Sequence, residues 1–278
     1  MLQVAPAIIY GTAWKKERTS ALVTQAIRHG FRAIDTACQP KHYDEAGVGA
    51  GVAAAMADGI RRGDLYLQTK FTPVDGHDPN RIPYDPRAPL PEQVAQSFRV
   101  SLQNLRTDYL DALVLHSPLP DQRRLLSVWG AMERIADSGG ARRLGISNCY
   151  DAKVLAALQH AARISPSIVQ NRFYAETGYD ATIRRFCRQH EIVYQSFWTL
   201  TANTVLLDSA AVRSAAARHE RTVAQVLFRY LTQRGVVPLT GTTSSAHMRE
   251  DLEIFEFELE TSECEAIDRI IEAAGQLP

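Results

Sequence analysis

Short apolar runs rich in β-branched residues alternate with longer segments of helical periodicity from one end of the chain to the other. Each of these runs has the length and composition of a buried strand. Alternation of this kind predicts repeated βα units around a parallel sheet. The eight expected strands lie at residues 7–10, 31–35, 65–70, 112–116, 143–147, 168–170, 192–197 and 236–239.

The segments between these runs carry apolar residues at helical spacing. Dividing the 278 residues among eight units gives about 35 residues per unit, which suits a βα repeat of roughly 30 residues or more. The expected fold class is therefore α/β, as a closed (β/α)8 TIM barrel. The expected helices lie at residues 20–29, 48–58, 92–105, 122–138, 152–161, 181–190, 222–234 and 262–274.

An open, doubly wound sheet would usually carry a glycine-rich phosphate turn after its first strand. The sequence YGTAWKKE at that point has none. Gly47, Gly49 and Gly51 come close to a dinucleotide fingerprint, but their spacing is wrong and no strand precedes them. We interpret these glycines as the start of a helix, which leaves the closed barrel as the prediction.

One barrel domain over residues 1–278 accounts for the length of the chain, because single (β/α)8 domains commonly reach about 250 residues. The only stretch with the composition of a linker is residues 72–91, TPVDGHDPNRIPYDPRAPLP. It directly follows the third expected strand, on the face where barrel enzymes bind their substrates. We therefore expect a long active-site loop there; a disordered surface excursion is the alternative.

Charge and cysteine content narrow the functional classes. Lys and Arg number 31 and Asp and Glu also 31, so the formal net charge is zero and no basic surface for nucleic acid or an anionic membrane is indicated. The four cysteines form no CxxC pair, which favours a reducing compartment. The longest run of small apolar residues, 47–57, is too short to span a bilayer. We expect a cytoplasmic protein with a small-molecule partner and, since no histidine pair has metal-ligand spacing, no metal.

Polar residues close several expected strands, at the position where barrel enzymes react. A lysine ends the apolar run LYLQTK and a histidine ends DALVLH. An unpaired buried charge costs several kcal/mol, so Lys70 needs a carboxylate, and Asp35 is the obvious one. The residues at the strand ends are Asp35, Lys70, His116, Ser147 with Asn148, Gln170, and Phe197.

At these positions the chain resembles the aldo-keto reductase superfamily over nearly its whole length. The matching motifs are GTAW, FRAIDTA, LQTK, DALVLHSP, LGISN and VVPLTGTTSSAHMREDL. The resemblance implies an NAD(P)H-dependent reduction of an aldehyde or ketone to an alcohol. It also implies a catalytic tetrad, which carries over as Asp35, Tyr43, Lys70 and His116.

The chemistry of such a tetrad has a physical logic of its own. Hydride transfer to a carbonyl builds negative charge on the oxygen, so the site must supply a proton and a positive environment. A tyrosine with a pKa of about 10 is a poor acid unless a nearby cation stabilises its phenolate. Lys70 would do this, Asp35 would hold Lys70, and His116 would direct the carbonyl. The loop DTACQPKHYDEAGVG is longer before its tyrosine than the usual family pattern, so His42 competes with Tyr43 as the donor.

For the cofactor, the resemblance assigns Ser147, Asn148 and Gln170 to the nicotinamide carboxamide and Phe197, in place of a tyrosine, to ring stacking. Backbone donors for the pyrophosphate are expected over residues 198–203. The other positions implied in cofactor binding are Thr12, Asp35, Trp198, Thr199 and Leu200.

The late segment departs from the family pattern. Where relatives that prefer the phosphorylated dinucleotide carry Lys-Ser, Arg and Glu-Asn, this chain has Gly241, Thr242, His247 and Asp251. Fewer basic side chains than usual are available to bind a 2′-phosphate, and Asp251 could instead accept a hydrogen bond from a ribose hydroxyl. NADPH is expected as the cofactor, with NADH possible and Arg249 as partial compensation.

The expected substrate is a carbonyl compound with an apolar body, placed against Trp14, His116 and Trp198. Two rival functions share this fold. One is a redox-silent subunit that binds the cofactor and acts as a regulator, and the other is a lyase or isomerase that reuses the Tyr-Lys acid. The sequence does not decide between a monomer and a weak dimer.

Overall fold

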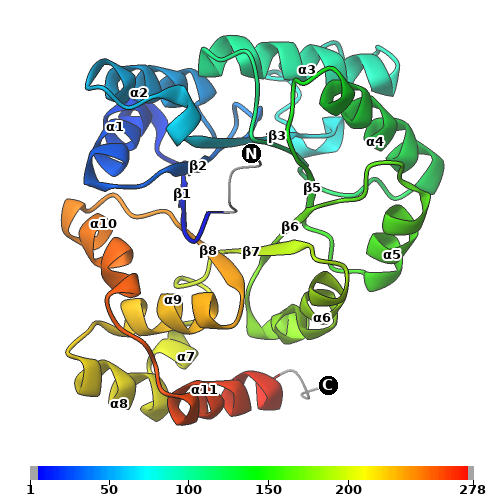
Figure 1. Ribbon diagram of the computed structural model, residues 1–278. Coiled ribbons are helices and arrows are strands. Elements are labelled where there is room, and N and C mark those ends of the chain that lie inside the picture. Colours follow the sequence, from blue (N-terminus) through cyan, green and yellow to red (C-terminus); the bar gives the residue numbers. More distant parts are fainter. Residues whose placement is uncertain (1–5, 275–278) are drawn as a thin grey trace.

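The computed structural model describes residues 6–274, which form a closed barrel of eight parallel strands. Each strand pairs with the next along the chain, and β8 closes the ring against β1. Figure 1 shows the ring surrounded by helices. The predicted (β/α)8 barrel is thus confirmed. The strands are β1 (Ile9–Gly11), β2 (Ala33–Asp35), β3 (Tyr66–Phe71), β4 (Ala112–Leu115), β5 (Leu144–Ser147), β6 (Ile168–Arg172), β7 (Val193–Phe197) and β8 (Val236–Thr240).

All eight predicted helices are present, with ends shifted by a few residues. Three further helices, α7, α8 and α10, were not predicted. Two of them are at most eight residues long, and α8 is rich in alanine and arginine, so none shows a strong apolar stripe. The helices are α1 (Thr19–His29), α2 (Glu45–Ala57), α3 (Leu90–Leu105), α4 (Gln122–Asp137), α5 (Ala152–Ala161), α6 (Ala181–Gln189), α7 (Thr204–Leu207), α8 (Ala210–His219), α9 (Val223–Gln233), α10 (Ser245–Leu252) and α11 (Thr261–Ala274).

Two hydrophobic clusters hold the barrel together. The larger one lies between the strands and the surrounding helices. The smaller one fills the barrel interior with residues from the beginnings of several strands, among them Ala33, Tyr66 and Ile168. Because inward-facing side chains recur every second residue, the next inward positions on these strands are Asp35, Gln68 with Lys70, and Gln170. The upper part of the barrel interior is therefore polar, above an apolar floor.

The glycine-rich segment near residue 50 is part of α2, as predicted. Asp44 caps this helix, and its carboxylate accepts a hydrogen bond from the backbone N–H of Gly47. A Cβ atom at Gly49 would lie 2.0 Å from the backbone oxygen of Asn104, and one at Gly51 would lie 2.7 Å from that of Ser20. These glycines allow α2 to pack closely against α3 and α1.

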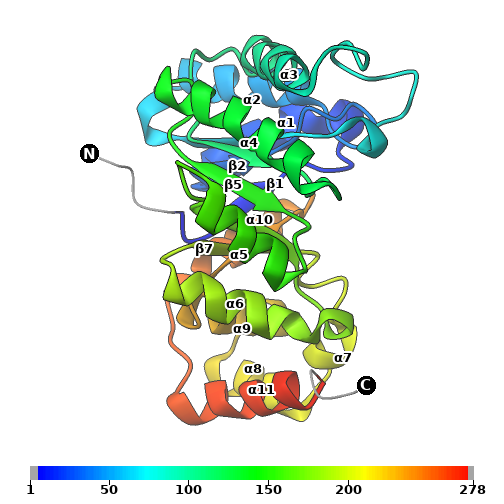
Figure 2. The same cartoon turned by 90° about the vertical axis from the view of Figure 1, so that its right-hand side faces the viewer.

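The long loop over residues 72–91 is held by the barrel and by α3. Tyr84 is buried and its hydroxyl donates to the backbone oxygen of Thr72 at 2.7 Å. Gln39 donates to the backbone oxygen of Gly76, and the backbone N–H of Asp85 donates to the side chain of Gln96. In Figure 2 the segment arches out beside α3. Among residues 6–274, no helix is both long and apolar enough to cross a bilayer.

Candidate active site

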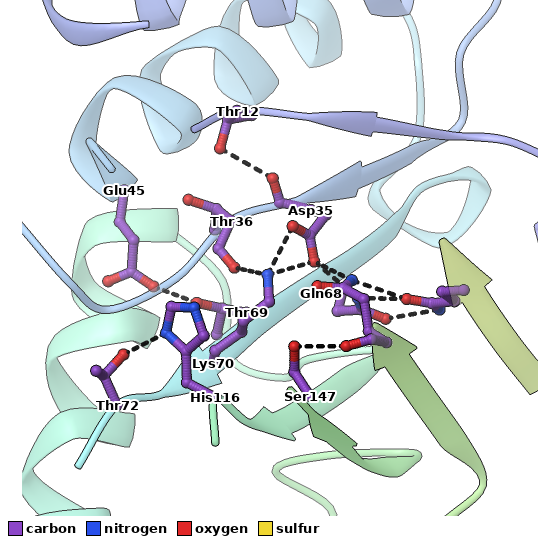
Figure 3. Close-up of polar contacts among 12 residues, drawn as sticks. Thr12, Asp35, Thr36, Glu45, Gln68, Thr69, Lys70, Thr72, His116 and Ser147 are labelled. Carbon is purple, nitrogen blue, oxygen red and sulfur yellow. Dashed lines mark hydrogen bonds and ion pairs between the residues drawn. The ribbon is translucent and has the colours of Figure 1, made fainter. Parts of the chain in front are cut away.

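A buried ion pair lies at the carboxyl ends of β2 and β3. Lys70 Nζ is 2.6 Å from each carboxylate oxygen of Asp35 and 2.9 Å from the backbone oxygen of Thr36, as Figure 3 shows. Lys70 is 1% exposed and Asp35 is 2% exposed. Burial lowers the pKa of Lys70, and the Asp35 carboxylate opposes this effect. The three contacts match the three hydrogens of the ammonium group, so Lys70 can act on a neighbour only through its charge.

Tyr43 lies beside this pair. Lys70 Nζ is 5.4 Å from the centre of the Tyr43 ring, and the His116 ring meets the tyrosine ring edge-on at 6.0 Å between centroids. Burial raises the pKa of the Tyr43 phenol above its ordinary value, and the Asp35 carboxylate adds to the rise. The phenol is therefore protonated at neutral pH and can serve as a proton donor.

His42, the competing donor, packs against Trp14 with 4.0 Å between ring centroids. Its backbone oxygen accepts a hydrogen bond from the backbone N–H of Trp14. Burial lowers the pKa of His42, so the neutral form dominates at neutral pH. Trp14 itself is 60% exposed, in a left-handed backbone conformation. The two rings together form an aromatic surface, and His42 directly precedes Tyr43 in the chain.

His116 directly follows β4, and its ring Nδ1 is 2.7 Å from the Thr72 hydroxyl. Burial, together with the charge of Lys70, holds the pKa of His116 well below its usual value. The ring is therefore neutral. When the Thr72 hydroxyl donates to Nδ1, the hydrogen of the imidazole resides on Nε2, which becomes a donor.

The residues assigned to the carboxamide come together on β5 and β6. The Ser147 hydroxyl donates to the backbone oxygen of Gln170 at 2.7 Å, and Figure 3 draws this hydrogen bond from Ser147. Asn148, in a left-handed conformation, donates to the backbone oxygen of His116 at 2.8 Å. Gln170 Nε2 donates to Asp35 Oδ1 at 3.0 Å. This last contact joins the cofactor residues to the ion pair and was not foreseen.

The segment after β7 carries the next group. Phe197 is half-buried against the interior cluster, and Trp198 is 52% exposed in a left-handed conformation. Thr199 is buried and its hydroxyl is 2.9 Å from that of Ser196, while Leu200 is half-buried. Asn203 ends the segment expected to supply backbone donors, and its side chain donates to the backbone oxygens of Phe173 and Thr199 and fixes the turn.

Arg172 is a residue that sequence reasoning missed. Its guanidinium lies 4.0 Å from the centre of the Trp198 ring and 5.1 Å from that of Tyr174. Arg172 Nε is buried without a hydrogen-bond partner among residues 6–274. Inward-facing side chains recur every second residue along a strand, so the position two residues after Gln170 could have pointed to Arg172. Trp198 is thus stacked on a cation rather than packed in the core.

After β1, Thr12 is held against β2, because its hydroxyl donates to the backbone oxygen of Asp35 at 2.9 Å. Gly241 follows β8 and is exposed, as is His247, and Thr242 is half-buried. Asp251 is buried and accepts a hydrogen bond from the Thr240 hydroxyl at 2.6 Å. The Asp251 carboxylate is therefore held against the end of β8 by this hydrogen bond.

Lys15 fills the space that Gly241 leaves. Its ammonium donates to the backbone oxygen of Gly241 and would lie 3.6 Å from a Cβ atom at that position. Lys15 is only 8% exposed, and no ion pair joins it to a carboxylate in residues 6–274. Burial lowers the pKa of Lys15, and the positive charge of Arg18 lowers it further. A buried cation without a counter-ion among the described residues has the charge to hold a phosphate group of a bound dinucleotide.

Within the described part of the chain, no group of three or more His, Cys, Asp or Glu side chains is arranged to hold a metal ion. All four cysteines are free and buried. The assembled groups are thus a phenol, an ammonium–carboxylate pair, a neutral imidazole and several amides. Such a set can move a proton and stabilise a developing negative charge.

Comparisons with known proteins agree with this arrangement. The model of the aldo/keto reductase family matches residues 7–272. The chain is 30% identical to the glyoxal reductase of Bacillus subtilis over 89% of its own length and 82% of the relative. It is 29% identical to a probable NAD(P)H-dependent D-xylose reductase of Arthroderma otae, over 95% and 88% of the two chains.

Solved structures give the same result. An aldo/keto reductase from Brucella melitensis superimposes with a TM-score of 0.81 at 26% identity, covering 95% of each chain. An aldo-keto reductase from Bombyx mori, solved in complex with NADP, superimposes with a TM-score of 0.80 at 25% identity, covering 95% of this chain and 89% of the other. The chain therefore belongs to the aldo/keto reductase family of NAD(P)H-dependent oxidoreductases.

Proposed function

We propose that the protein reduces an aldehyde or ketone to an alcohol, reversibly, with NADPH as the preferred cofactor and Tyr43 as the proton donor. The observation that carries the proposal is the buried Asp35–Lys70 pair, with two 2.6 Å contacts, beside a protonated phenol at the mouth of the barrel. The names of two relatives, a glyoxal reductase and a probable D-xylose reductase, support a small carbonyl compound as the substrate.

A bound reduced nicotinamide supplies the hydride in such a reaction. The roles of this chain's residues follow from their contacts. The neutral His116 donates from Nε2 to the carbonyl oxygen and so orients it. Tyr43 gives its proton to the oxygen as negative charge develops there. The charge of Lys70 stabilises the phenolate that remains, and Asp35 keeps that charge in place.

The choice of NADPH rests on Lys15. The family lysine is replaced by Gly241 here, but the ammonium of Lys15 reaches the same location from the loop after β1. A charge-assisted hydrogen bond to a phosphate contributes roughly 1.5 to 3 kcal/mol. Arg249 is exposed in α10 and adds a further positive charge.

The substrate contacts Trp14, His116 and Trp198 in this proposal, with the His42–Trp14 surface as the apolar wall. We further propose that the enzyme works in the cytoplasm as a monomer or weak dimer, without nucleic-acid or membrane partners. The four free, buried cysteines support a reducing compartment.

The direct test is consumption of NADPH with an aromatic aldehyde such as 4-nitrobenzaldehyde, followed at 340 nm with identification of the alcohol product. We expect turnover that depends on both the enzyme and the aldehyde. Tight NADPH binding without turnover, over a panel of aldehydes and ketones, would favour a redox-silent regulatory subunit. Conversion of a substrate without net oxidation of NADPH would favour a lyase or isomerase.

A further inference from the structure

Three glutamine side chains from three strands meet inside the barrel, directly beneath the ion pair. Gln68 lies on β3, Gln170 on β6 and Gln195 on β7, and all three are buried. We call these residues the glutamine cluster. Of the three, only Gln170 is assigned a role, in cofactor binding. The presence of two further buried amides needs a reason, because each buried polar group must find hydrogen-bond partners.

The hydrogen bonds within the glutamine cluster fix the orientation of each side-chain amide. A carboxylate can only accept hydrogen bonds, so the Asp35 oxygen obliges Gln68 and Gln170 to present their NH2 groups, at 2.7 and 3.0 Å. The second hydrogen of each NH2 group reaches Gln195 Oε1, at 2.8 and 2.9 Å. Gln195 Nε2 in turn donates to Gln68 Oε1 at 3.1 Å. Figure 3 shows Gln68 beside Asp35 in this network.

This arrangement leaves one hydrogen-bond acceptor of the Gln170 side chain, Oε1, for the cofactor. Both hydrogens of the Gln170 amide are engaged, by Asp35 and by Gln195, so its Nε2 cannot turn outward. Gln170 Oε1 has no hydrogen-bond partner in residues 6–274 and is not among the fully buried unpaired atoms. The side chain of Gln170 therefore presents a carbonyl oxygen, an acceptor. The backbone oxygen of the same residue accepts a hydrogen bond from Ser147, which in turn contacts Asn148.

We infer that Gln195 is a positioning residue that holds the Gln170 amide in one orientation, so that Gln170 Oε1 selects a cofactor ring bearing a hydrogen-bond donor, the carboxamide NH2 group. The same hydrogen bonds connect Gln170 to Asp35. One network therefore positions both the cofactor ring and the Lys70 ammonium. The inference rests on the proposed function, because it assumes that a nicotinamide dinucleotide binds at this end of the barrel.

The test compares two oxidised cofactors that differ only at the ring substituent. NADP+ carries the carboxamide, whereas its 3-acetylpyridine analogue carries a methyl ketone and has no NH2 group. In the wild-type protein we expect calorimetry to give a Kd about tenfold lower for NADP+, the ratio that one hydrogen bond of about 1.4 kcal/mol provides. In Gln195→Met, where Gln170 loses one of its two anchors, we expect this ratio to fall below about threefold.

Two further variants separate positioning from a general loss of structure. Gln195→Glu in its protonated form keeps one accepting oxygen and one O–H donor, so it should retain the wild-type ratio. Gln93→Met removes a buried glutamine that binds only the backbone oxygens of Pro86 and Ala88, and should also leave the ratio unchanged. If Gln195→Met does not fold, Gln195→Leu takes its place.

Two results would overturn the inference. One is a Gln195→Met or Gln195→Leu protein that discriminates as well as the wild type, and the other is an equal loss of affinity for both cofactors. Because the readout is binding, it is independent of turnover. Absence of aldehyde reduction in the wild type, with the Kd ratio intact, would count against the proposed function and leave the role of Gln195 standing.

Discussion

Asp35 and Lys70 could be paired from the sequence, because each ends an apolar strand and a buried cation requires a carboxylate. The partners of Gln170 could not be foreseen. Its contact to Asp35 crosses the barrel from β6 to β2, and its contact to Gln195 joins two neighbouring strands. The paired residues are 135 and 25 positions apart in the sequence, so no local pattern specifies these contacts. Lys15 was missed for the same reason, since only the fold brings it to Gly241.

Removing the ammonium of Lys15 tests whether it contacts the 2′-phosphate. In Lys15→Met, we expect the Kd of NADPH to rise by roughly ten- to a hundredfold, as a lost charge-assisted contact would cause. The Kd of NADH should change by less than about threefold. Calorimetric titration with both cofactors measures these shifts, with the exposed Lys16→Met as the matched control. An equal weakening of both cofactors would place Lys15 at the pyrophosphate instead.

Burial raises the pKa of Asp251 to about 6, above the ordinary value of 3.8. A raised carboxyl pKa means that the folded state binds the proton more tightly. The stability it confers is complete at low pH and is lost as the pH rises through about 6. Asp251→Asn removes this dependence while keeping an acceptor for Thr240. Between pH 4.5 and 7.5 we expect the variant to gain about 2 kcal/mol relative to the wild type, measured by urea unfolding. A pH-independent difference would contradict the burial argument.

The helices show where an element follows from local pattern and where it does not. The long amphipathic helices were predicted because their apolar faces cover the sheet. α10 was missed because SSAHMRED reads as a polar loop, although the Ser244 side chain caps it. α2 was predicted, but the reason for its glycines, the close approach of α1 and α3, is visible only in three dimensions.

The packing of α2 gives a prediction at this scale. Replacing glycine by alanine within a helix ordinarily stabilises it by about 0.5 to 1 kcal/mol. At Gly49 the added methyl group would meet the backbone of Asn104 and Leu105, so we expect Gly49→Ala to destabilise the protein by about 2 kcal/mol or more. Gly130→Ala in α4, where the nearest atom is 3.9 Å away, is the control and should be neutral or stabilising. Equal effects of the two changes on urea unfolding would rule out close packing at Gly49.

For the whole molecule, the closed barrel followed from the count and spacing of the apolar runs together with the lack of a glycine-rich phosphate turn after the first strand. The alternation also placed the polar strand ends on one face. The sequence did not predict the extra helices after β7 and β8.

Brief digestion with trypsin tests whether the chain is one domain. Arg81 and Arg87 are exposed in the loop over residues 72–91, so we expect early cleavage there. The two fragments should stay together in gel filtration, because β3 and β4 pair across the cut. Separation into two independently folded pieces would contradict a single barrel domain.

The measurement that bears most directly on the proposed activity is the turnover of Tyr43→Phe with saturating NADPH and an aromatic aldehyde. The substitution removes the phenol hydroxyl and little volume, so kcat should fall by about a hundredfold or more. The Kd of NADPH, measured by titration, should stay within about twofold of the wild type. If Tyr43→Phe retained most of its activity, Tyr43 would not be the proton donor, and His42 or a water molecule would have to take that role.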